Sequence, residues 1–264
     1  MLHHMNAKRI VVKVGSSTLT HSTGKLNLRR IDQLAKTLSD LMNAGREVVL
    51  VSSGAIAVGR AKMNLPYHGA TTAEKQAAAA IGQCELMDIY DRAFGNYGRT
   101  TAQVLLTKDV LDNEHSKQNA VNTFEQLLSM GVIPIVNEND TISFEEIEFG
   151  DNDTLSAMVA AMIGAQSLVL LTDIDGLYNK NPSEPDAQLI PVVFRIDDEL
   201  RAVAGGSGSK VGTGGMITKL NAAEIATKAG IAMTIANGKS PELLYDIYEG
   251  HSVGTLFLPQ EQTL

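Results

Sequence analysis

The fold of this 264-residue chain is decided first by the stretch RIVVKVGSS, residues Arg9–Ser17. Its apolar, mostly β-branched residues lack the regular polar alternation of a half-exposed strand, so they predict a strand buried on both faces. Strands of this kind occur almost only in parallel sheets that helices cover on both sides. The glycine and two serines that follow mark the end of the strand.

Further short apolar stretches alternate with segments of helical periodicity. Apolar residues recur at helical spacing over Ile31–Met42, where Gly45 ends the helix, and a capping box at Thr71–Glu74 opens a long helix that reaches about Phe94. This alternation predicts an α/β fold with a largely parallel sheet covered on both sides. The other predicted strands are Val48–Val51, Gln103–Leu106, Val132–Val136, Ser167–Leu171, Ile231–Ile235 and Thr255–Leu258, and the other predicted helices are Ala120–Leu128, Leu155–Ile163, Met216–Ala229 and Pro241–Tyr248.

Composition excludes several classes of protein. No apolar run reaches the roughly 18 residues of a membrane-spanning helix, so a soluble, cytoplasmic protein without membrane contact is expected. The net charge of −8 argues against nucleic-acid binding, which needs clustered lysine and arginine. Cys84 is the only cysteine, which excludes an internal disulfide, and it is expected to pack as a small apolar group. Leu2–His4 is interpreted as an expression remnant ahead of a natural start at Met5.

Polar and small residues follow four of the predicted strands. In parallel sheets, ligands bind beyond the carboxyl ends of the strands, so these residues are predicted to share one site. Turns are polar in any case, and each segment alone is weak evidence. The four segments are Lys13–Ser17, Ser52–Ala55, Asn137–Asp140 and Thr172-Asp173.

Lys13 and Ser53 are the candidate contacts at the first two strand ends. An ammonium group near the end of a buried strand is unfavourable unless an anion meets it, so Lys13 is predicted to contact a phosphate. A snorkelling or ion-paired lysine is the alternative. Gly15 and Gly54 would let a ligand approach the backbone, although Gly15 alone could be an ordinary turn residue. Ser53 is predicted to bind a carboxylate through its hydroxyl, with a helix cap as the alternative.

The glycine-rich segment Gly212–Lys219 is the strongest single signal for a nucleotide. Three glycines in four residues lead into a predicted helix, so backbone N–H groups can surround an anion. Lys219 adds a full positive charge one turn further on. The segment therefore predicts a phosphate site, with a hinge as the alternative. The loop Ala204–Gly215, rich in glycine and serine, predicts a lid beside that site.

Asn137–Asp153 is dense in acidic and amide side chains. A solvated surface loop is the ordinary interpretation, but neutral amides such as Asn152 suit a polar substrate. Asp153 begins an apolar helix, either as an N-cap or as an anchor for nearby cations. Thr172-Asp173 offers a carboxylate to a ribose hydroxyl or an adenine amine, with an aspartate-stabilised turn as the alternative. The six histidines show no metal-ligand spacing, so no metal bound by protein side chains is predicted.

Taken in order, these segments resemble the amino acid kinase family over nearly the whole chain. Within that family they resemble the branch that phosphorylates L-glutamate in the first step of proline synthesis. Asn137–Asp140 followed by Gly150–Asp153 separates this branch from kinases of aspartate, carbamate, acetylglutamate and uridylate. The segments that carry the resemblance are Val11–Ser16, Val51–Ala57, Asn137–Asp140, Phe149–Asp153, Leu171–Asp173, Gly212–Leu220 and Gly254–Phe257.

The resemblance implies a three-layer α/β/α sandwich around a mainly parallel central sheet. The short form is expected, a single kinase domain over residues 1–264 without the C-terminal PUA domain of many bacterial relatives. An acceptor lobe at about 1–165 and a nucleotide lobe at about 166–264 are expected within it. The resemblance further implies a homo-oligomer, either dimer or tetramer, and feedback inhibition by proline.

The resemblance also implies ATP with Mg²⁺, held mainly by phosphates and water, and phosphoryl transfer to the side-chain carboxylate of L-glutamate. Lys13 and Lys219 would flank the transferred phosphoryl group, and Asp153 would hold both lysines. The implied glutamate contacts are Ser53, Gly54, Asp140 and Asn152, with Asp140 at the α-amino group. The implied nucleotide contacts are Lys13, Gly15, Thr172, Asp173, Thr213, Gly214, Gly215, Met216, Ile217, Thr218 and Lys219.

Two other functions stay open at this point. One is a kinase of the same fold acting on carbamate, aspartate or a nucleoside monophosphate. The other is a non-catalytic sensor of amino acids or nucleotides, which is disfavoured because both candidate catalytic lysines are present.

Overall fold

The computed structural model describes residues 2–21, 23–65, 70–142, 152–206 and 215–260. Their central element is one eight-stranded sheet with the order β3-β4-β2-β1-β5-β7-β8-β6. Neighbouring strands are parallel except for β7 and β8, which are antiparallel. The strands are β1 (Arg9–Val14), β2 (Glu47–Ser52), β3 (Thr101–Leu106), β4 (Ile133–Glu138), β5 (Ser167–Thr172), β6 (Val192–Val193), β7 (Ala232–Asn237) and β8 (Thr255–Phe257).

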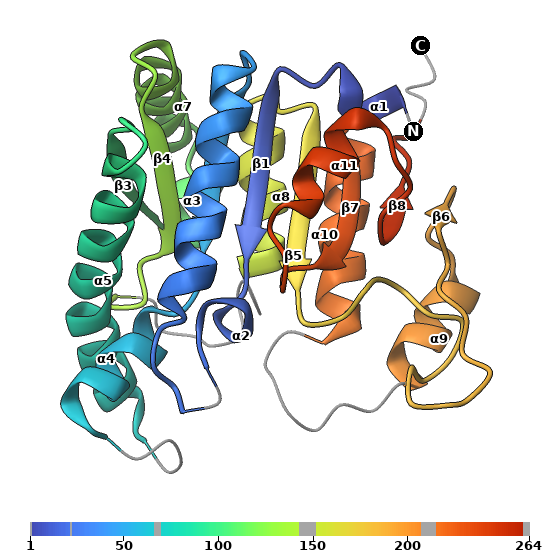
Figure 1. Cartoon of the computed structure of the whole chain (residues 1–264), viewed down its shortest axis with the longest axis horizontal. Coiled ribbons are helices and arrows are strands. Elements are labelled where there is room, and N and C mark those ends of the chain that lie inside the picture. The colour runs from blue at the N-terminus through green and yellow to red at the C-terminus, as the bar shows by residue number, and fades with distance from the viewer. Residues whose placement is uncertain (1, 22, 66–69, 143–151, 207–214, 261–264) are drawn as a thin grey trace.

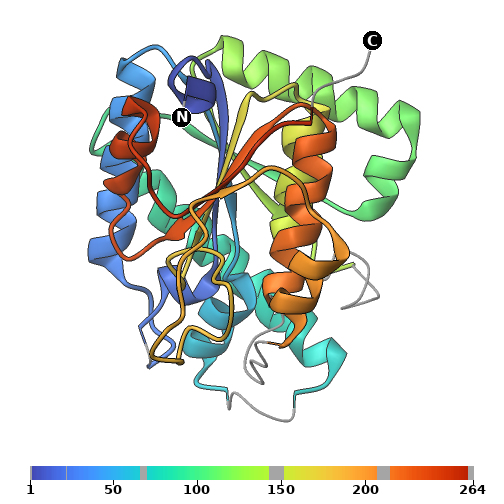
Figure 2. The same ribbon diagram turned by 90° about the vertical axis from the view of Figure 1, so that its right-hand side faces the viewer.

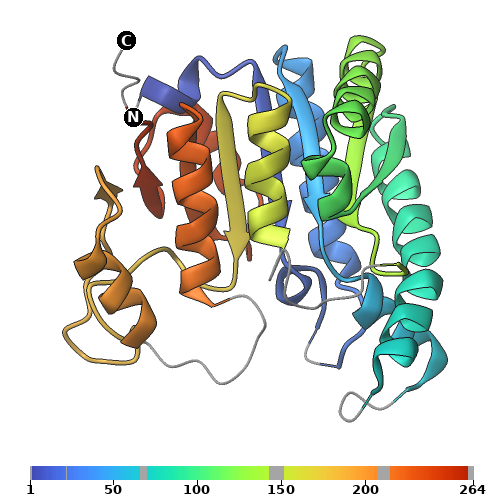
Figure 3. The same cartoon turned by 180° about the vertical axis from the view of Figure 1, so that it is seen from behind.

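Helices cover both faces of this sheet and make three layers (Figures 1, 2 and 3). One face carries α3 (Leu28–Asn43), α5 (Thr72–Gly95) and α11 (Leu243–Glu249), and the other carries α7 (Glu114–Ser129), α8 (Asn152–Met162) and α10 (Met216–Lys228). The shorter helices are α1 (Leu2–Met5), α2 (Ser16–Leu19), α4 (Ala55–Met63), α6 (Lys108–Asp112) and α9 (Asp198–Gly206). This arrangement confirms the predicted mainly parallel α/β/α sandwich. Every helix in the described part of the chain is too short or too polar to cross a bilayer.

The side chains of β1 alternate between two apolar cores. Val12 and Val14 pack in the core beneath α3 and α11, whereas Val11 packs in the core beneath α8 and α10. Successive side chains of a strand point to opposite faces, so Lys13 lies on the same face as Val11. The strand therefore directs Lys13 toward the layer that contains α8 and α10.

The predicted strands and helices are all present, with ends displaced by a few residues. The capping box before α5 is confirmed, because Thr71 Oγ1 accepts from the Glu74 amide at 3.3 Å and Glu74 Oε2 accepts from the Thr71 amide at 2.7 Å. The strand β6 and the helices α1, α2, α4, α6 and α9 were not predicted. With two residues, β6 is too short for periodicity to reveal.

Two expectations need correction. Ala204 lies in α9, so the glycine- and serine-rich segment does not begin as a loop; residues 207–214 lie outside the described part of the chain. Cys84 is exposed on α5 rather than packed as an apolar group.

His4 is buried, with ring nitrogens 2.8 Å from the hydroxyls of Ser167 and Thr234. These contacts attach α1 to β5 and β7. They do not test whether Leu2–His4 is an expression remnant.

Candidate active site

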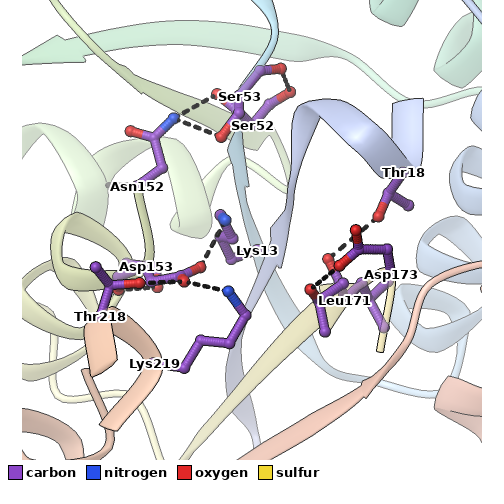
Figure 4. A network of polar contacts seen from close by, with 12 residues as sticks. Lys13, Thr18, Ser52, Ser53, Asn152, Asp153, Leu171, Asp173, Thr218 and Lys219 are labelled. Atoms are coloured by element: carbon purple, nitrogen blue, oxygen red, sulfur yellow. Dashed lines mark hydrogen bonds and ion pairs between the residues drawn. The ribbon is translucent and has the colours of Figure 1, made fainter. Parts of the chain in front are cut away.

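The carboxyl ends of four parallel strands bring the predicted site segments together. In the sheet register, Val14 at the end of β1 pairs with Ser52 of β2 on one side and Leu171 of β5 on the other. β4 lies beyond β2, with Val51 paired to Val136. Polar residues that are far apart in sequence thus become neighbours at one edge of the sheet, which Figure 4 shows from close by.

Two lysines converge on one buried carboxylate. Lys13 Nζ lies 2.5 Å from Asp153 Oδ1, and Lys219 Nζ lies 3.0 Å from Asp153 Oδ2 (Figure 4). Asp153 is fully buried, and the two lysines are 4% and 6% exposed. Two positive charges therefore meet one negative charge away from bulk water, where electrostatic attraction is strong. The three side chains together carry a net positive charge, so the binding of a further anion beside them would be favourable.

Each member of this trio is positioned by a different element. Lys13 comes from β1 by the alternation described above, Asp153 from the first turn of α8, and Lys219 from the first turn of α10. The carboxylate of Asp153 also accepts from the Thr218 hydroxyl at 3.3 Å. The Asp153 carboxylate thus contacts two cations and a residue of α10. These contacts fit the prediction that Asp153 anchors nearby cations.

Of the two interpretations of Lys13, the structure shows the ion-paired lysine, because its ammonium group contacts Asp153. This ion pair does not exclude a contact with phosphate. The same ammonium group lies beside Gly15, where an added Cβ atom would be 3.7 Å from Lys13 Nζ. The ammonium group therefore stands next to a glycine at the end of β1, where a phosphate could approach the backbone closely.

The start of α10 has the properties of an anion site. Gly215 is its N-cap residue and makes no side-chain capping bond, so the first amides of the helix have no side-chain acceptor there. Met216 is partly buried and Ile217 is 38% exposed, which leaves this turn accessible. Thr218 Oγ1 donates to the Gly215 carbonyl at 2.8 Å and stabilises the turn. The predicted contacts Thr213 and Gly214 lie outside the described residues.

A second cluster contains Asn152 and Ser53. Asn152 Nδ2 donates to Ser53 Oγ at 2.8 Å and to Asn137 Oδ1 at 2.9 Å, and Figure 4 shows it directed at the end of β2. Because these bonds use both hydrogens of the amide, Asn152 can offer a ligand only its Oδ1 acceptor. Ser53 accepts in this bond and keeps one hydrogen to donate.

Gly54 turns the chain from β2 into α4. Its φ of 110° lies in the left-handed region that favours glycine. Gly54 is the N-cap residue of α4, and no side chain caps this helix, so the cap interpretation of Ser53 is wrong. The Ser53 amide instead donates to the Val14 carbonyl at 3.1 Å, which holds the ends of β2 and β1 together.

Asp140 follows β4 and is half-buried. Burial, and to a smaller extent the nearby charge of Glu138, raises the pKa of Asp140 to about 6. A carboxylate that is costly to ionise gains most from a cationic partner. Asp140 thus offers an acceptor to an ammonium group, three residues after Asn137, the residue that bonds Asn152.

The ends of β5 and β7 form the other side of the site. Thr172 is buried and donates to Asp173 Oδ1 at 3.1 Å, while Asp173 itself is exposed. This contact fits the turn interpretation and leaves the carboxylate accessible to a hydroxyl donor. Gly238 is close-packed here, because an added Cβ would lie 2.7 Å from Thr18 Cγ2.

Two functional candidates were missed from the sequence. Asn137 belongs to a predicted polar segment, but no contact was predicted for its side-chain amide. Asn137 is 2% exposed and is bonded to Asn152. Gln83 lies 54 residues earlier in an alanine-rich helix and bonds Asn137. Helical periodicity indicates that Gln83 lies on a buried face of the helix. The sequence does not indicate which residue its amide contacts.

The described residues offer no group of metal-ligating side chains at the strand ends. One cluster that could hold a metal, Asp246, Glu249 and His251, is exposed and belongs to α11 and the segment after it. Both oxygens of Asp153 are engaged by ammonium groups.

Comparisons with known proteins show the family to which this chain belongs. The chain matches the amino acid kinase family over residues 8–237. It is 53% identical over 261 residues to glutamate 5-kinase of Clostridium perfringens, which covers 97% of each chain. It is 52% identical over 257 residues to glutamate 5-kinase of Enterococcus faecalis, which covers 96% of this chain and 95% of the relative.

Two solved structures share the fold. Carbamate kinase from Giardia lamblia bound to AMP-PNP has a TM-score of 0.67 at 18% identity, covering 97% of this chain and 100% of that chain. The product complex of T. acidophilum isopentenyl phosphate kinase has a TM-score of 0.64 at 18% identity, covering 94% and 99%. At this identity the likeness shows the fold alone.

Proposed function

Because this chain belongs to the amino acid kinase family, we propose that it phosphorylates the side-chain carboxylate of L-glutamate with ATP. The product would be L-glutamyl 5-phosphate, and the reaction is the first step of proline synthesis. Glutamate 5-kinases match the chain at about half identity over nearly its full length. The structural observation that carries the proposal is the convergence of Lys13 and Lys219 on Asp153, beside a cluster suited to an amino acid.

The chemistry requires charge neutralisation more than proton transfer. A carboxylate is already a nucleophile at neutral pH, so no general base is needed. The obstacle is the approach of one anion to another, and positioned cations remove it. Lys13 and Lys219 contact different oxygens of Asp153, so together they can flank a phosphoryl group in transfer. Asp153 holds both ammonium groups in place.

The acceptor cluster has the donors and acceptors of an α-amino acid site. Asp140 and Asn152 Oδ1 are acceptors for an α-ammonium group. The Ser53 hydroxyl and the uncapped start of α4 at Gly54 are donors for a carboxylate. We assign these four residues to glutamate.

The nucleotide would lie along the ends of β1 and β5 and at the start of α10. Lys13 and the first turn of α10 offer donors to phosphates, and Gly15 leaves room for them to approach the backbone. Thr172 and Asp173 offer polar groups to the nucleoside. Thr213 and Gly214 belong to the same assignment by resemblance. Mg²⁺ on the phosphates would lower their negative charge, and we expect phosphates and water to supply its ligands.

The remaining expectations belong to the same proposal. Within the kinase domain we expect an acceptor lobe at about 1–165 and a nucleotide lobe at about 166–264, although Lys13 and Gly15 of the first are assigned to the nucleotide. We also expect a cytoplasmic homo-oligomer, dimer or tetramer, that proline inhibits. The net charge of −8 is the reason why no nucleic-acid partner is expected.

The decisive test is turnover of ATP with L-glutamate, with the unstable acyl phosphate trapped by hydroxylamine as a hydroxamate. We expect ADP and hydroxamate in equal amounts, and less of both when proline is added. Carbamate, aspartate and uridine monophosphate serve as competing acceptors in parallel ADP-release assays. Faster turnover with any of these would replace glutamate as the substrate, and binding without turnover of any acceptor would favour the sensor.

A further inference from the structure

Helix α5 contacts the acceptor cluster from behind through a buried amide. Gln83 is 8% exposed, and its Oε1 accepts a 3.0 Å hydrogen bond from Asn137 Nδ2. Asn137, near the end of β4, bonds Asn152 in turn. Three amides thus form a chain from α5 to the cluster that we assign to glutamate.

Each bond in this chain fixes the orientation of the next amide. Asn137 Oδ1 accepts from the Glu138 amide at 2.9 Å and from Asn152 Nδ2 at 2.9 Å. Its NH₂ end must therefore face Gln83, which meets it with a carbonyl oxygen. Because Asn152 Nδ2 is held by Asn137 and Ser53, its carbonyl oxygen is the end left for a ligand.

We infer that Gln83 is a positioning residue for the acceptor substrate, an inference that rests on the proposed function. Without its carbonyl oxygen, the NH₂ group of Asn137 would be buried with no acceptor. The Asn137 side chain would then turn toward the open site, where water can meet that group, and would release Asn152. The Asn152 amide would lose its fixed orientation and with it a defined acceptor for the substrate ammonium.

Packing alone does not account for an amide at this position. Gln83 Nε2 is buried and has no hydrogen-bond partner among the described residues. An apolar side chain of the same length would fill the space without leaving that donor unsatisfied. The carbonyl oxygen directed at Asn137 is what the amide adds.

A second contact shows that α5 supports this edge of the sheet. Tyr90 lies two helical turns after Gln83 on the same face, and its hydroxyl is 2.8 Å from Ser52 Oγ. Ser52 directly precedes Ser53. The helix is therefore attached by polar bonds to the ends of both β4 and β2, where the acceptor cluster is built.

Two substitutions of similar size separate positioning from packing. Gln83→Glu keeps an acceptor oxygen for Asn137, whether the carboxyl group is ionised or protonated, whereas Gln83→Met has none. We expect Gln83→Met to raise the KM for glutamate about tenfold, with the KM for ATP within about twofold of the wild-type value. Gln83→Glu should stay within about threefold of the wild-type KM for glutamate. Gln126→Met, on the exposed part of α7, is the matched control.

A packing role predicts the reverse order, with Gln83→Met close to wild type and Gln83→Glu impaired by its buried charge; that order would overturn the inference. If Gln83→Met unfolds at the assay temperature, Gln83→Asn, which is too short to reach Asn137, replaces it with the same expectation. Should wild-type protein use a different acceptor, the proposed function fails, and the KM for that acceptor is measured instead. An unchanged acceptor KM in Gln83→Met would then still refute the positioning role.

Discussion

Lys13, Asp153 and Lys219 show how one residue can hold two others. A buried ammonium group is costly without a partner, and a single carboxylate serves both lysines here. The arrangement keeps two cations side by side that would otherwise repel each other.

Lys219→Ala should lower kcat about 10²- to 10³-fold, because a positioned cation would be lost from the transferred phosphoryl group. The KM for glutamate should change little, since Lys219 belongs to the nucleotide side. Asp153 keeps its ion pair with Lys13, so the variant should fold. Steady-state kinetics with both substrates varied give the answer.

Lys228→Ala is the matched control on the same helix. Lys228 is exposed at the end of α10 and pairs with Glu224 at 2.6 Å. Its loss should leave kcat unchanged. A Lys219→Ala enzyme that keeps more than about a third of the wild-type kcat would contradict the assigned role.

Asp140 should make substrate affinity depend on pH. Its pKa of about 6 means that the carboxylate becomes protonated as the pH falls through 6, and the KM for glutamate should then rise. Asp140→Asn should have a raised KM at pH 8 and a flatter pH profile. KM measured from pH 5 to 8 for both proteins tests this, with the exposed Asp112→Asn as control. An unchanged KM in Asp140→Asn would place the ammonium group elsewhere.

At the scale of elements, α4 and α5 cross with their backbones in close contact. A Cβ atom added to Gly82 would lie 1.8 Å from the Ala55 carbonyl oxygen, and one added to Gly59 would lie 1.8 Å from that of Ala78. Two glycines, one on each helix, thus permit this approach. Since α4 begins at Gly54 beside Ser53, the crossing also sets where the acceptor cluster begins.

Gly82→Ala should force the two helices apart and lower the free energy of unfolding by at least about 2 kcal/mol. The KM for glutamate should rise in parallel, because the start of α4 moves with the helix. Gly95→Ala is the control at the end of the same helix, where an added Cβ meets no atom within 4 Å. It should be neutral or stabilising by up to about 1 kcal/mol. Equal denaturation midpoints for the two variants would show that the crossing tolerates a methyl group.

At the scale of the whole molecule, α1 is fastened to the amino ends of two central strands. His4 lies between the hydroxyls of Ser167 in β5 and Thr234 in β7, and Arg46 stacks on Tyr248 nearby, 4.5 Å from the ring centroid. Burial is the main cause that lowers the pKa of His4 to about 4. The neutral imidazole offers one donor and one acceptor to the two hydroxyls.

The pH dependence of folding follows from the sign of this shift. The folded-state pKa of His4 lies below the unfolded value of 6.5, so its contribution is complete above pH 6.5 and is lost as the pH falls toward 4. By linkage this amounts to about 3 kcal/mol. The pKa of Asp140 is raised instead, from 3.8 to about 6, so its contribution of similar size is complete below pH 3.8 and lost as the pH rises through 6.

These two opposing contributions overlap between pH 4 and 6, so single variants are needed to separate them. Relative to wild type, His4→Gln should lose less stability on acidification, and Asp140→Asn should lose more. His3→Gln, at an exposed neighbour of His4, should follow the wild-type curve. Denaturant unfolding at pH 4.5 and 7.5 provides the comparison. Parallel curves for His4→Gln and wild type would mean that folding does not lower the pKa of His4.

What the sequence determined by itself was local. Apolar runs such as Arg9–Val14, which lack polar alternation, indicate strands covered on both faces. The capping box at Thr71–Glu74 specifies a helix start through neighbouring atoms. Polar segments after these strands indicated one site because strand ends of a parallel sheet share an edge.

Only the tertiary structure decided which side chains meet. The contacts of Asp153 with Lys13 and Lys219 depend on β1 lying between β2 and β5 and on α8 and α10 covering the same face. The bond from Gln83 to Asn137 joins residues 54 positions apart, and His4 reaches β5 and β7 over longer separations. Local periodicity encodes which face of an element is buried, but not its neighbour in space. That choice comes from packing all elements against one another at once.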